Sequence, residues 1–310
     1  MPGLPQLTLD SDSLSLARAS YAPTTFRNYS TQWKALLEYL SLANIPKKFP
    51  LPPHVLLLYI SHLARSGKAV STIKSTVAAI ATIHNLLYDT DPTKNLLISR
   101  SLKGLEKVSK EPSSLLPITR DLLASLLARL DFLDLPRFDT TATKAIFALA
   151  YMGCFRIGEL VFSESGKHTA KLENFSILKF PAGKELRILL PSFKHHSAPA
   201  SITIKESTGS FCAIKLLENY LSIRPKTSDY LFLDKEGRPY NRGEIAKTLK
   251  RGLRNLVPST KRYNTHSLRI GRTSDLVRQG APESIIQQTG RWKSLAYRSY
   301  FRVQNFQMPE

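Results

Sequence analysis

The apolar positions in the first third of the chain recur at the spacing of amphipathic helices. Five of them fall at steps of three and four and share one helix face: Phe26, Tyr29, Trp33, Leu36 and Leu40. Further helices are expected after Pro53, from Ser71 and over about 94–108. Residues 1–20 are rich in Ser and Leu but show no clear periodicity. The pattern predicts a loosely ordered arm followed by a small helical bundle over 21–110.

The periodicity changes in the second part of the chain. Proline and serine interrupt it over 111–118, which is predicted to be a linker to a second domain over 119–310. Three short, partly alternating segments in that domain, FSILKF, LRILLP and SITIK, predict a three-stranded antiparallel sheet. Helical patterns surround it, at about 119–131, 139–152, 209–222, 241–256, 266–279 and 282–289. The predicted fold class is mainly α with a small antiparallel β-sheet.

The charge of the chain favours a polyanionic partner. The 44 Lys and Arg against 24 Asp and Glu give a net charge of +20. Residues 240–302 alone hold 14 Lys or Arg and 3 Asp or Glu, a surplus of +11. No apolar run approaches the roughly 18 residues of a membrane-spanning helix, and MPGLPQLTLD lacks the features of a signal peptide. Nucleic acid is therefore the expected partner, inside the cell and without a membrane.

Individual basic residues on predicted helices are candidates for contact with DNA. They are Lys103 and Lys107 in the first domain, and Arg242, Lys247, Lys250, Arg251 and Arg272 in the second. A solvated helix face explains Lys103 and Lys107 equally well. Arg272 and Arg278 are expected to tune affinity and salt dependence rather than cleavage.

Seven residues with chemically useful side chains are spread through the second domain. They are Arg156 and Glu159 in GCFRIGEL, Lys194 in the second β connection, His266 and Arg269 in HSLR, Trp292 in GRW, and Tyr300. In this order they resemble the motifs of the tyrosine recombinase (phage-integrase-type) superfamily: Arg, Lys, His-x-x-Arg, His or Trp, then Tyr. HSLRIG and GRWKSLAYRSYFR look most like the recombinases of eukaryotic DIRS- and Crypton-type mobile elements.

The resemblance covers the whole chain and carries further expectations. It implies a SAM-like, helical core-binding domain and an α+β catalytic domain that together form a clamp around double-stranded DNA. It also implies a synaptic tetramer on two DNA sites, and a nuclear location. The implied reaction needs neither a metal nor another cofactor, and the two cysteines alone cannot make a zinc site.

The residue types suit attack of a tyrosine oxygen on a phosphodiester. Arg156 and Arg269 can hold the nonbridging oxygens, because a guanidinium stays protonated and presents a planar fork. His266 lies three residues before Arg269 on one helix face, so it can bond the same phosphate or help remove the tyrosine proton. Lys194 is the expected acid for the 5′ oxygen, Trp292 an indole donor, and Tyr300 the nucleophile. Glu159 can orient an arginine, although an ordinary helix N-terminal carboxylate is nearly as good an explanation.

Several alternatives remain open at this point. Tyr297 competes with Tyr300, and Lys184 with Lys194; His195 and His196 could share proton transfer. The superfamily commonly places its tyrosine about nine residues after its His or Trp. Tyr300 lies eight residues after Trp292 and nine after Arg291, so Arg291 could occupy that position instead.

The activity also has alternatives. They are a DNA-relaxing enzyme of the type IB topoisomerase kind, a DNA-binding regulator that has lost catalysis, and an RNA-binding or chromatin-associated scaffold. The last explains the charge but not the order of the motifs.

Overall fold

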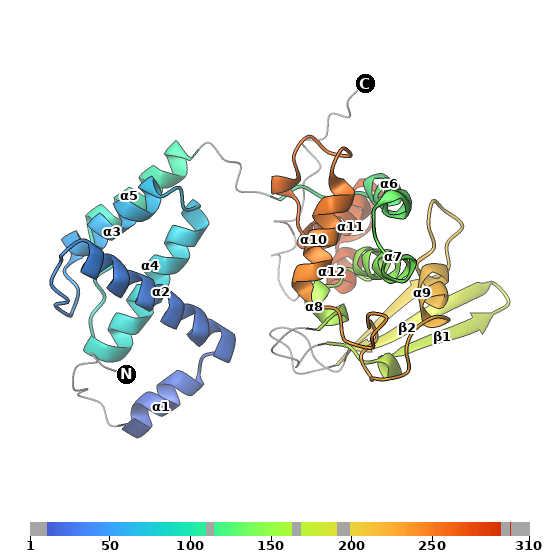
Figure 1. Ribbon diagram of the computed structural model, residues 1–310, viewed down its shortest axis with the longest axis horizontal. Coiled ribbons are helices and arrows are strands. Elements are labelled where there is room, and N and C mark those ends of the chain that lie inside the picture. Colours follow the sequence, from blue (N-terminus) through green and yellow to red (C-terminus); the bar gives the residue numbers. More distant parts are fainter. Residues whose placement is uncertain (1–10, 110–114, 163–168, 191–198, 293–297, 299–310) are drawn as a thin grey trace. The chain divides into compact units, whose positions relative to one another are not determined.

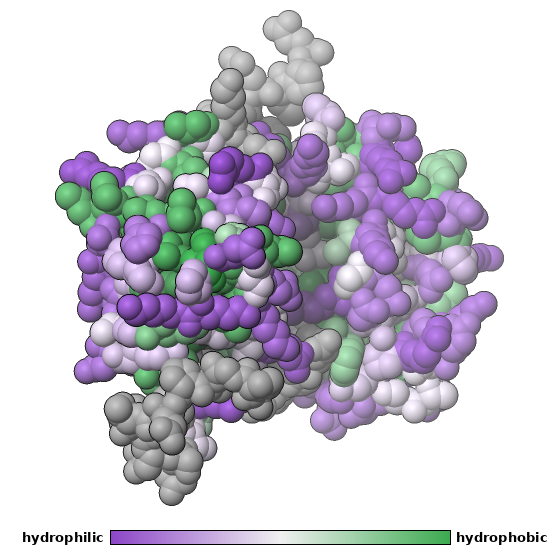
Figure 2. All heavy atoms as spheres, turned by 60° about the vertical axis from the view of Figure 1, so that its left-hand side comes forward, coloured by the Kyte–Doolittle hydropathy of each residue, from purple (hydrophilic) through white to green (hydrophobic). Residues whose placement is uncertain are grey.

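The computed structural model describes residues 11–109, 115–162, 169–190, 199–292 and 298 of the 310-residue chain. The chain divides into two compact units, Met1–Ser113 and Ser114–Glu310 (Figure 1). No helix in the described part is long and apolar enough to cross a membrane. Most of the face visible in Figure 2 is hydrophilic, interrupted by areas where apolar residues reach the surface.

Helices alone build the described part of the first unit. They are α1 (Ser11–Ala19), α2 (Pro23–Leu42), α3 (Pro53–Arg65), α4 (Val70–Tyr88) and α5 (Leu96–Val108). Prolines open α2 and α3, where their missing N–H costs nothing, and the Asn95 side chain caps α5. The predicted stripe supplies Leu36 and Leu40 to a core that also takes Leu56 and Ile80, all without exposed surface. The helical bundle predicted from periodicity is confirmed.

The N-terminal arm differs from the prediction. Residues 11–19 form helix α1, where an irregular segment was expected. The Arg18 guanidinium lies 4.2 Å from the centroid of the Phe26 ring on α2, and the Ser20 hydroxyl donates to the Ala17 carbonyl. These contacts support the end of a helix whose sequence has little periodicity of its own.

The second unit packs helices around one small sheet. Its helices are α6 (Arg120–Arg129), α7 (Arg137–Met152), α8 (Ile157–Leu160), α9 (Ala213–Leu221), α10 (Arg242–Leu253), α11 (His266–Arg278) and α12 (Glu283–Gly290). Three 3₁₀ turns lie between them: η1 (Leu130–Phe132), η2 (Leu172–Asn174) and η3 (Thr260–Arg262). The strands are β1 (Phe175–Phe180), β2 (Gly183–Leu190) and β3 (Ala200–Lys205).

The sheet is the three-stranded antiparallel sheet that the alternating segments predict. Its order is β1-β2-β3, with Phe180 opposite Gly183 at one end of β2 and Leu190 opposite Ala200 at the other. Leu186, Ile188 and Leu190 alternate with more exposed residues and are fully buried. This inward face fixes the register of the sheet against the helical core.

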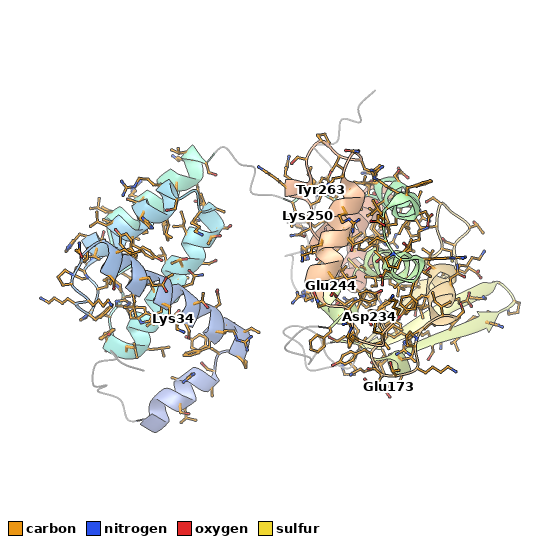
Figure 3. All side chains as sticks on the ribbon, in the orientation of Figure 1. Lys34, Glu173, Asp234, Glu244, Lys250 and Tyr263 are labelled. Atoms are coloured by element: carbon orange, nitrogen blue, oxygen red, sulfur yellow. The ribbon has the colours of Figure 1, made fainter. Side chains whose placement is uncertain are left out.

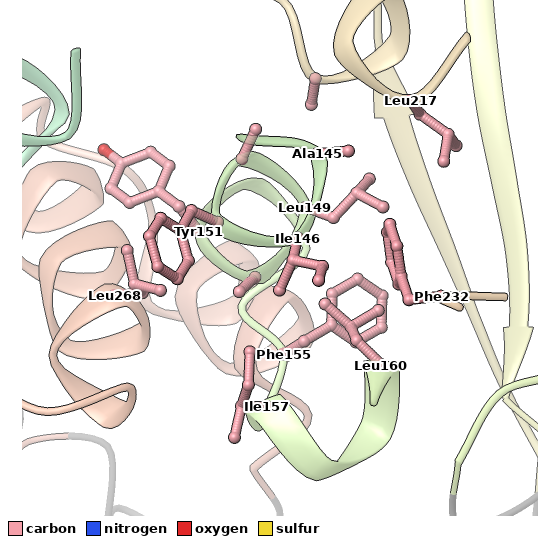
Figure 4. Close-up of a cluster of buried hydrophobic side chains, with 14 of the residues drawn as sticks. Ala145, Ile146, Leu149, Tyr151, Phe155, Ile157, Leu160, Leu217, Phe232 and Leu268 are labelled. Atoms are coloured by element: carbon pink, nitrogen blue, oxygen red, sulfur yellow. The ribbon is translucent and has the colours of Figure 1, made fainter. Parts of the chain in front are cut away.

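Helix α7 lies at the centre of the second unit and sets the position of the site. All seven residues from Ala145 to Tyr151 have no exposed surface, so α7 is covered on every side near its C-terminal end. Figure 4 shows Tyr151 and Leu268 on one side of this helix and Leu217 and Phe232 on the other. The chain leaves α7 through a turn at Gly153–Phe155 and enters α8.

A buried carboxylate fixes α11 against α6 and α7. Asp275 Oδ2 accepts hydrogen bonds from the Tyr151 hydroxyl at 2.5 Å and the Arg120 backbone N–H at 2.7 Å. Its Oδ1 accepts from Arg278 at 3.0 Å. These bonds fix the helix that begins with His266.

The second half of the predicted linker belongs to the core of the second unit. The backbone N–H groups of Leu116 and Ile118 donate to the carbonyls of Arg262 and Ser267, and Ile118 has no exposed surface. A Cβ at Gly271 would overlap the Ile118 carbonyl, so glycine permits this close approach to α11. The segment therefore pairs with a part of the chain about 150 residues away, which local composition does not reveal.

Candidate active site

A tight turn between α7 and α8 carries the first arginine of the site. Gly153 is required here, because a Cβ would overlap the Phe155 ring. Cys154 follows with φ of +51°, a left-handed conformation that is uncommon for cysteine. Phe155 turns inward and is fully buried. The turn leaves Arg156 at the N-cap of α8 with its side chain 30% exposed.

Glu159 lies at the centre of the site. Its carboxylate is buried and accepts three hydrogen bonds. Oε1 accepts from Arg156 Nη1 at 3.1 Å, and Oε2 accepts from the Arg156 backbone N–H at 2.9 Å. Oε2 also accepts from Arg291 Nη2 at 2.7 Å. One carboxylate thus joins two arginines that are 135 positions apart in the sequence.

Helix α11 brings His266 and Arg269 to the same place. Asn264 Oδ1 accepts from the His266 backbone N–H at 2.8 Å and defines the start of the helix. Arg269 is one turn later and has no exposed surface. Its Nη1 donates to the Cys154 carbonyl at 2.7 Å and its Nη2 to the Gly290 carbonyl. Arg269 Nε has no hydrogen-bond partner in the structure.

The environment of His266 keeps its imidazole neutral. Burial lowers its pKa from the ordinary 6.5 to about 4, with further lowering by the charges of Arg269 and Arg156. The Glu159 carboxylate acts in the opposite direction but is the smallest of these effects. A neutral imidazole at pH 7 has one nitrogen that can accept a proton.

The turn after α12 contributes three consecutive residues. Gly290 supplies the carbonyl that Arg269 binds. The Arg291 guanidinium donates to the carbonyls of Gly153 at 3.0 Å and Cys154 at 3.3 Å, in addition to Glu159. The Trp292 ring lies with its centroid 4.5 Å from Arg269 Cζ. Both alternatives left open by the sequence, Arg291 and Trp292, therefore lie in this cluster.

The cluster has a net positive charge. Arg156, Arg269 and Arg291 carry three positive charges, Glu159 carries one negative charge, and neutral His266 adds none, so the sum is +2. A phosphodiester carries one negative charge, and the transition state for attack on it carries about two. The charge of the cluster therefore matches the transition state better than the ground state.

Of the two lysines that could act as the acid, Lys184 and Lys194, only Lys184 lies in the described part of the chain. Lys184 lies at the start of β2, where its Nζ forms an ion pair with Glu218 at 2.6 Å. That carboxylate raises the pKa of Lys184, whereas a lysine that donates a proton to the departing 5′ oxygen is a better acid with a lowered pKa. Lys184 is beside the turn between β1 and β2, six residues, roughly 20 Å, from the opposite end of β2. Figure 1 shows this turn well away from α8.

Five of the predicted residues lie outside the described part of the chain. They are Lys194, His195, His196, Tyr297 and Tyr300. The connection that contains Lys194 leaves β2 at Leu190, at the other end of the strand from Lys184.

The candidate DNA contacts fall into two groups by exposure. Lys103 and Lys107 are exposed on α5, and Arg242, Lys247, Lys250 and Arg251 are exposed on α10, where Lys250 and Glu244 are labelled in Figure 3. Arg272 is half-buried, with its Cζ 5.8 Å from the Tyr151 ring centroid.

Helix α10 has one continuous basic face. Lys247, Lys250 and Arg251 lie on it at i, i+3 and i+4, and Arg254 follows directly after the last helical residue at the C-cap; all four are exposed. Arg254 was not among the predicted DNA contacts. No group of three or more His, Cys, Asp or Glu side chains that could hold a metal ion occurs among the described residues.

Comparisons with known proteins identify the family and the fold of the chain. The phage integrase family matches residues 126–307, more than half of the chain. The tyrosine recombinase XerD of Halalkalibacterium halodurans is 25% identical over 274 residues, which cover 85% of this chain and 81% of XerD. A lambda integrase tetramer bound to a Holliday junction aligns with a TM-score of 0.64 at 12% identity, over 96% of this chain and 78% of the integrase. The Tn1549 transposon integrase in complex with circular intermediate DNA aligns with a TM-score of 0.61 at 15% identity, over 92% and 91% of the two chains. The chain thus belongs to the phage integrase family and has the fold of the tyrosine recombinases.

Proposed function

We propose that this protein is a site-specific DNA recombinase that cuts and rejoins DNA through a covalent 3′-phosphotyrosyl intermediate. The observation that carries the proposal is the cluster around Glu159. Arg156, His266 and Arg269 come together there from segments more than 100 residues apart, with a net charge suited to a phosphoryl-transfer transition state.

In the proposed reaction the Tyr300 oxygen forms a bond to the scissile phosphorus while the bond to the 5′ oxygen breaks. Arg156 and Arg269 bind the nonbridging oxygens as negative charge builds on them. Neutral His266 accepts the tyrosine proton, and Lys194 donates a proton to the departing 5′ oxygen. Attack by a 5′ hydroxyl on the phosphotyrosine reverses these steps and rejoins the strand, so no external energy source is needed.

Arg156 and Arg269 differ in how accessible their guanidinium groups are to a phosphate. Arg156 is partly exposed and can meet a phosphate directly. Arg269 has no exposed surface, and two of its nitrogens already bind carbonyls. Its Nε, which has no partner, can reach a phosphate oxygen once the adjacent Trp292 ring moves aside. This displacement is part of the proposal.

The proposed DNA contacts include the basic face of α10. Three exposed cations on one helix face, with Arg254 directly after the helix, fit the backbone of duplex DNA, and Lys103 and Lys107 of the first unit add to them. We further propose a tetrameric complex on two DNA sites, a role in a mobile element of the DIRS or Crypton type, and a nuclear location. By analogy, the lambda integrase tetramer, similar in fold, supports the tetrameric complex, and the Tn1549 transposon integrase supports a role in a mobile element; the DIRS or Crypton type rests on the sequence motifs alone.

Covalent trapping tests the chemistry. The protein is incubated in EDTA with suicide DNA that carries the cognate site, for example an end of the mobile element, and the products are separated by denaturing electrophoresis. A protein–DNA adduct is expected with the wild type and with Tyr297→Phe, and none with Tyr300→Phe. Tight binding without an adduct would favour a catalytically inactive regulator. Relaxation of supercoiled DNA without exchange between two sites would favour a type IB topoisomerase activity.

A further inference from the structure

We propose that Arg291 is a positioning residue for cleavage: it holds Glu159, and through it Arg156, in the geometry that meets the phosphate, and does not itself bind the DNA. This inference rests on the proposed function. It concerns the position at which the superfamily carries a His or Trp, nine residues before the tyrosine candidate.

The contacts of Arg291 point into the protein. Its guanidinium donates to the carbonyls of Gly153 and Cys154 and to the Glu159 carboxylate, and its side chain is 5% exposed. The Arg156 side chain is 30% exposed by comparison. A guanidinium held by three internal acceptors cannot turn to a phosphate without breaking these hydrogen bonds and leaving Glu159 to Arg156 alone.

The backbone at Arg291 gives a second, independent argument. Arg291 ends α12 in the left-handed conformation, with φ of +57° and ψ of +44°. Glycine is the usual residue at such a position, and a residue with a Cβ is disfavoured there. An arginine is therefore unfavourable for the turn itself, and its side-chain contacts must offset the cost.

The effect on Arg156 follows from the shared carboxylate. Glu159 Oε2 is divided between Arg291 and the Arg156 backbone N–H, which leaves only Oε1 for the Arg156 guanidinium. Without Arg291, the Arg156 side chain can take both oxygens in a bidentate pair and withdraw from the phosphate. The loss would also reduce the net charge of the cluster from +2 to +1.

The test uses the full-length protein and two Arg291 variants. Arg291→Gly removes the guanidinium and suits the left-handed backbone, so its melting temperature should stay within a few degrees of the wild type. Arg291→Lys keeps the charge but not the planar fork. Arg156→Ala, which removes a proposed phosphate ligand, is the control. Single-turnover adduct formation is measured on suicide DNA with a natural scissile phosphate or a methylphosphonate, which lacks one charged oxygen.

We expect Arg291→Gly to bind DNA with an unchanged Kd but to form adduct about 100-fold more slowly, because a small displacement of a catalytic group has effects of this size. The rate of adduct formation by Arg291→Lys should lie between those of Arg291→Gly and the wild type. A neutral methylphosphonate should partly restore the rate of both Arg156→Ala and Arg291→Gly, since less charge must be neutralised when Arg156 is lost or withdrawn. Because Arg291 acts through Arg156, the double variant Arg156→Ala/Arg291→Gly should form adduct about as slowly as Arg156→Ala alone.

Three results would overturn the inference. A double variant Arg156→Ala/Arg291→Gly that is slower than Arg156→Ala by the full effect of Arg291→Gly would make Arg291 a direct phosphate ligand. An unchanged rate would leave it without a role. If Arg291→Gly does not fold, the Arg291→Lys variant decides instead: a wild-type rate of adduct formation would likewise leave Arg291 without a role. Failure of the proposed function gives a different result, because the wild type itself would form no adduct on the natural phosphate, and the inference would fall with it.

Discussion

We expect acidification to destabilise the second unit through His266, and a His266→Gln variant to lose that sensitivity. The pKa of His266 is about 4 in the folded protein and 6.5 in an unfolded chain, so between these values the unfolded state binds more protons. The destabilisation caused by protonation of His266 is absent above pH 6.5, grows as the pH falls and levels off below pH 4. At pH 5 it lowers the free energy of unfolding by about 2 kcal/mol relative to a protein in which His266 is unprotonated in both states.

The measurement must isolate the second unit, because burial also lowers the pKa of His84 in the first unit. The chain has two tryptophans, Trp33 in the first unit and Trp292 in the second. In a Trp33→Phe background, Trp292 fluorescence therefore reports on the second unit alone. Urea unfolding at pH 7, 6 and 5 gives the free energy of unfolding for this background with and without His266→Gln.

The carboxylates and the other histidines titrate in both proteins, so the difference between the two isolates His266. Between pH 7 and pH 5 the protein with His266 should lose close to 2 kcal/mol more than the variant. Equal losses within about 0.5 kcal/mol would refute the reasoning, as would an NMR titration of the imidazole with a midpoint near 6.5. Either result would also remove the argument that burial and the neighbouring arginines keep His266 neutral.

Three further predictions concern packing, a buried network and DNA contact. Gly271→Ala should destabilise the second unit by about 1–3 kcal/mol in urea unfolding, because the new Cβ overlaps the Ile118 carbonyl. Asp275→Ala should cost about 3 kcal/mol in the same assay, since it leaves the Tyr151 hydroxyl and a backbone N–H without their acceptor. Lys247→Ala should weaken DNA binding and reduce the slope of log K against log salt by about 1, as expected for loss of one phosphate contact.

Each of these predictions has a matched control in the chain. Gly104→Ala places a Cβ in open space on α5 and should not destabilise the protein. Tyr151→Phe removes only one donor to Asp275 and should cost less than the loss of the acceptor. Lys235→Ala removes an exposed lysine that pairs with Glu236 and should leave the salt slope unchanged. A cost of Gly271→Ala no larger than that of Gly104→Ala would contradict the close approach at Ile118.

Local patterns predicted the elements of the fold but not their long-range contacts. The stripe of Leu36 and Leu40 and the alternation of Ile188 and Leu190 each appear within a few residues, and both face the cores as expected. The hydrogen bonds of Leu116 and Ile118 go to the carbonyls of Arg262 in η3 and Ser267 in α11, which are far along the chain. Composition marked that segment as linker because its prolines and serines interrupt a helix, and nothing local indicates its distant partner.

The parts of the site that depend on local spacing were also predicted, and those that depend on long-range contacts were not. The three-residue spacing of His266 and Arg269 follows from the helix, and the motif order indicated that Arg156 belongs with them. The contribution of Arg291 depends on the left-handed end of α12, which directs the side chain to Glu159. Sequence spacing identified Arg291 as an alternative, but residue type favoured Trp292. A backbone angle, which the sequence does not display, allows both to take part.

The complete burial of Arg269 affects how a strongly basic protein behaves among small anions. Free phosphate, nucleotides and other multivalent anions are attracted to positive charge, but they cannot reach a guanidinium with no exposed surface. Moving the Trp292 ring needs binding energy that a small anion does not supply and that a duplex gains over many contacts. Arg269 thus remains unavailable to competing metabolites until DNA is bound, so the protein should resist inhibition by inorganic phosphate.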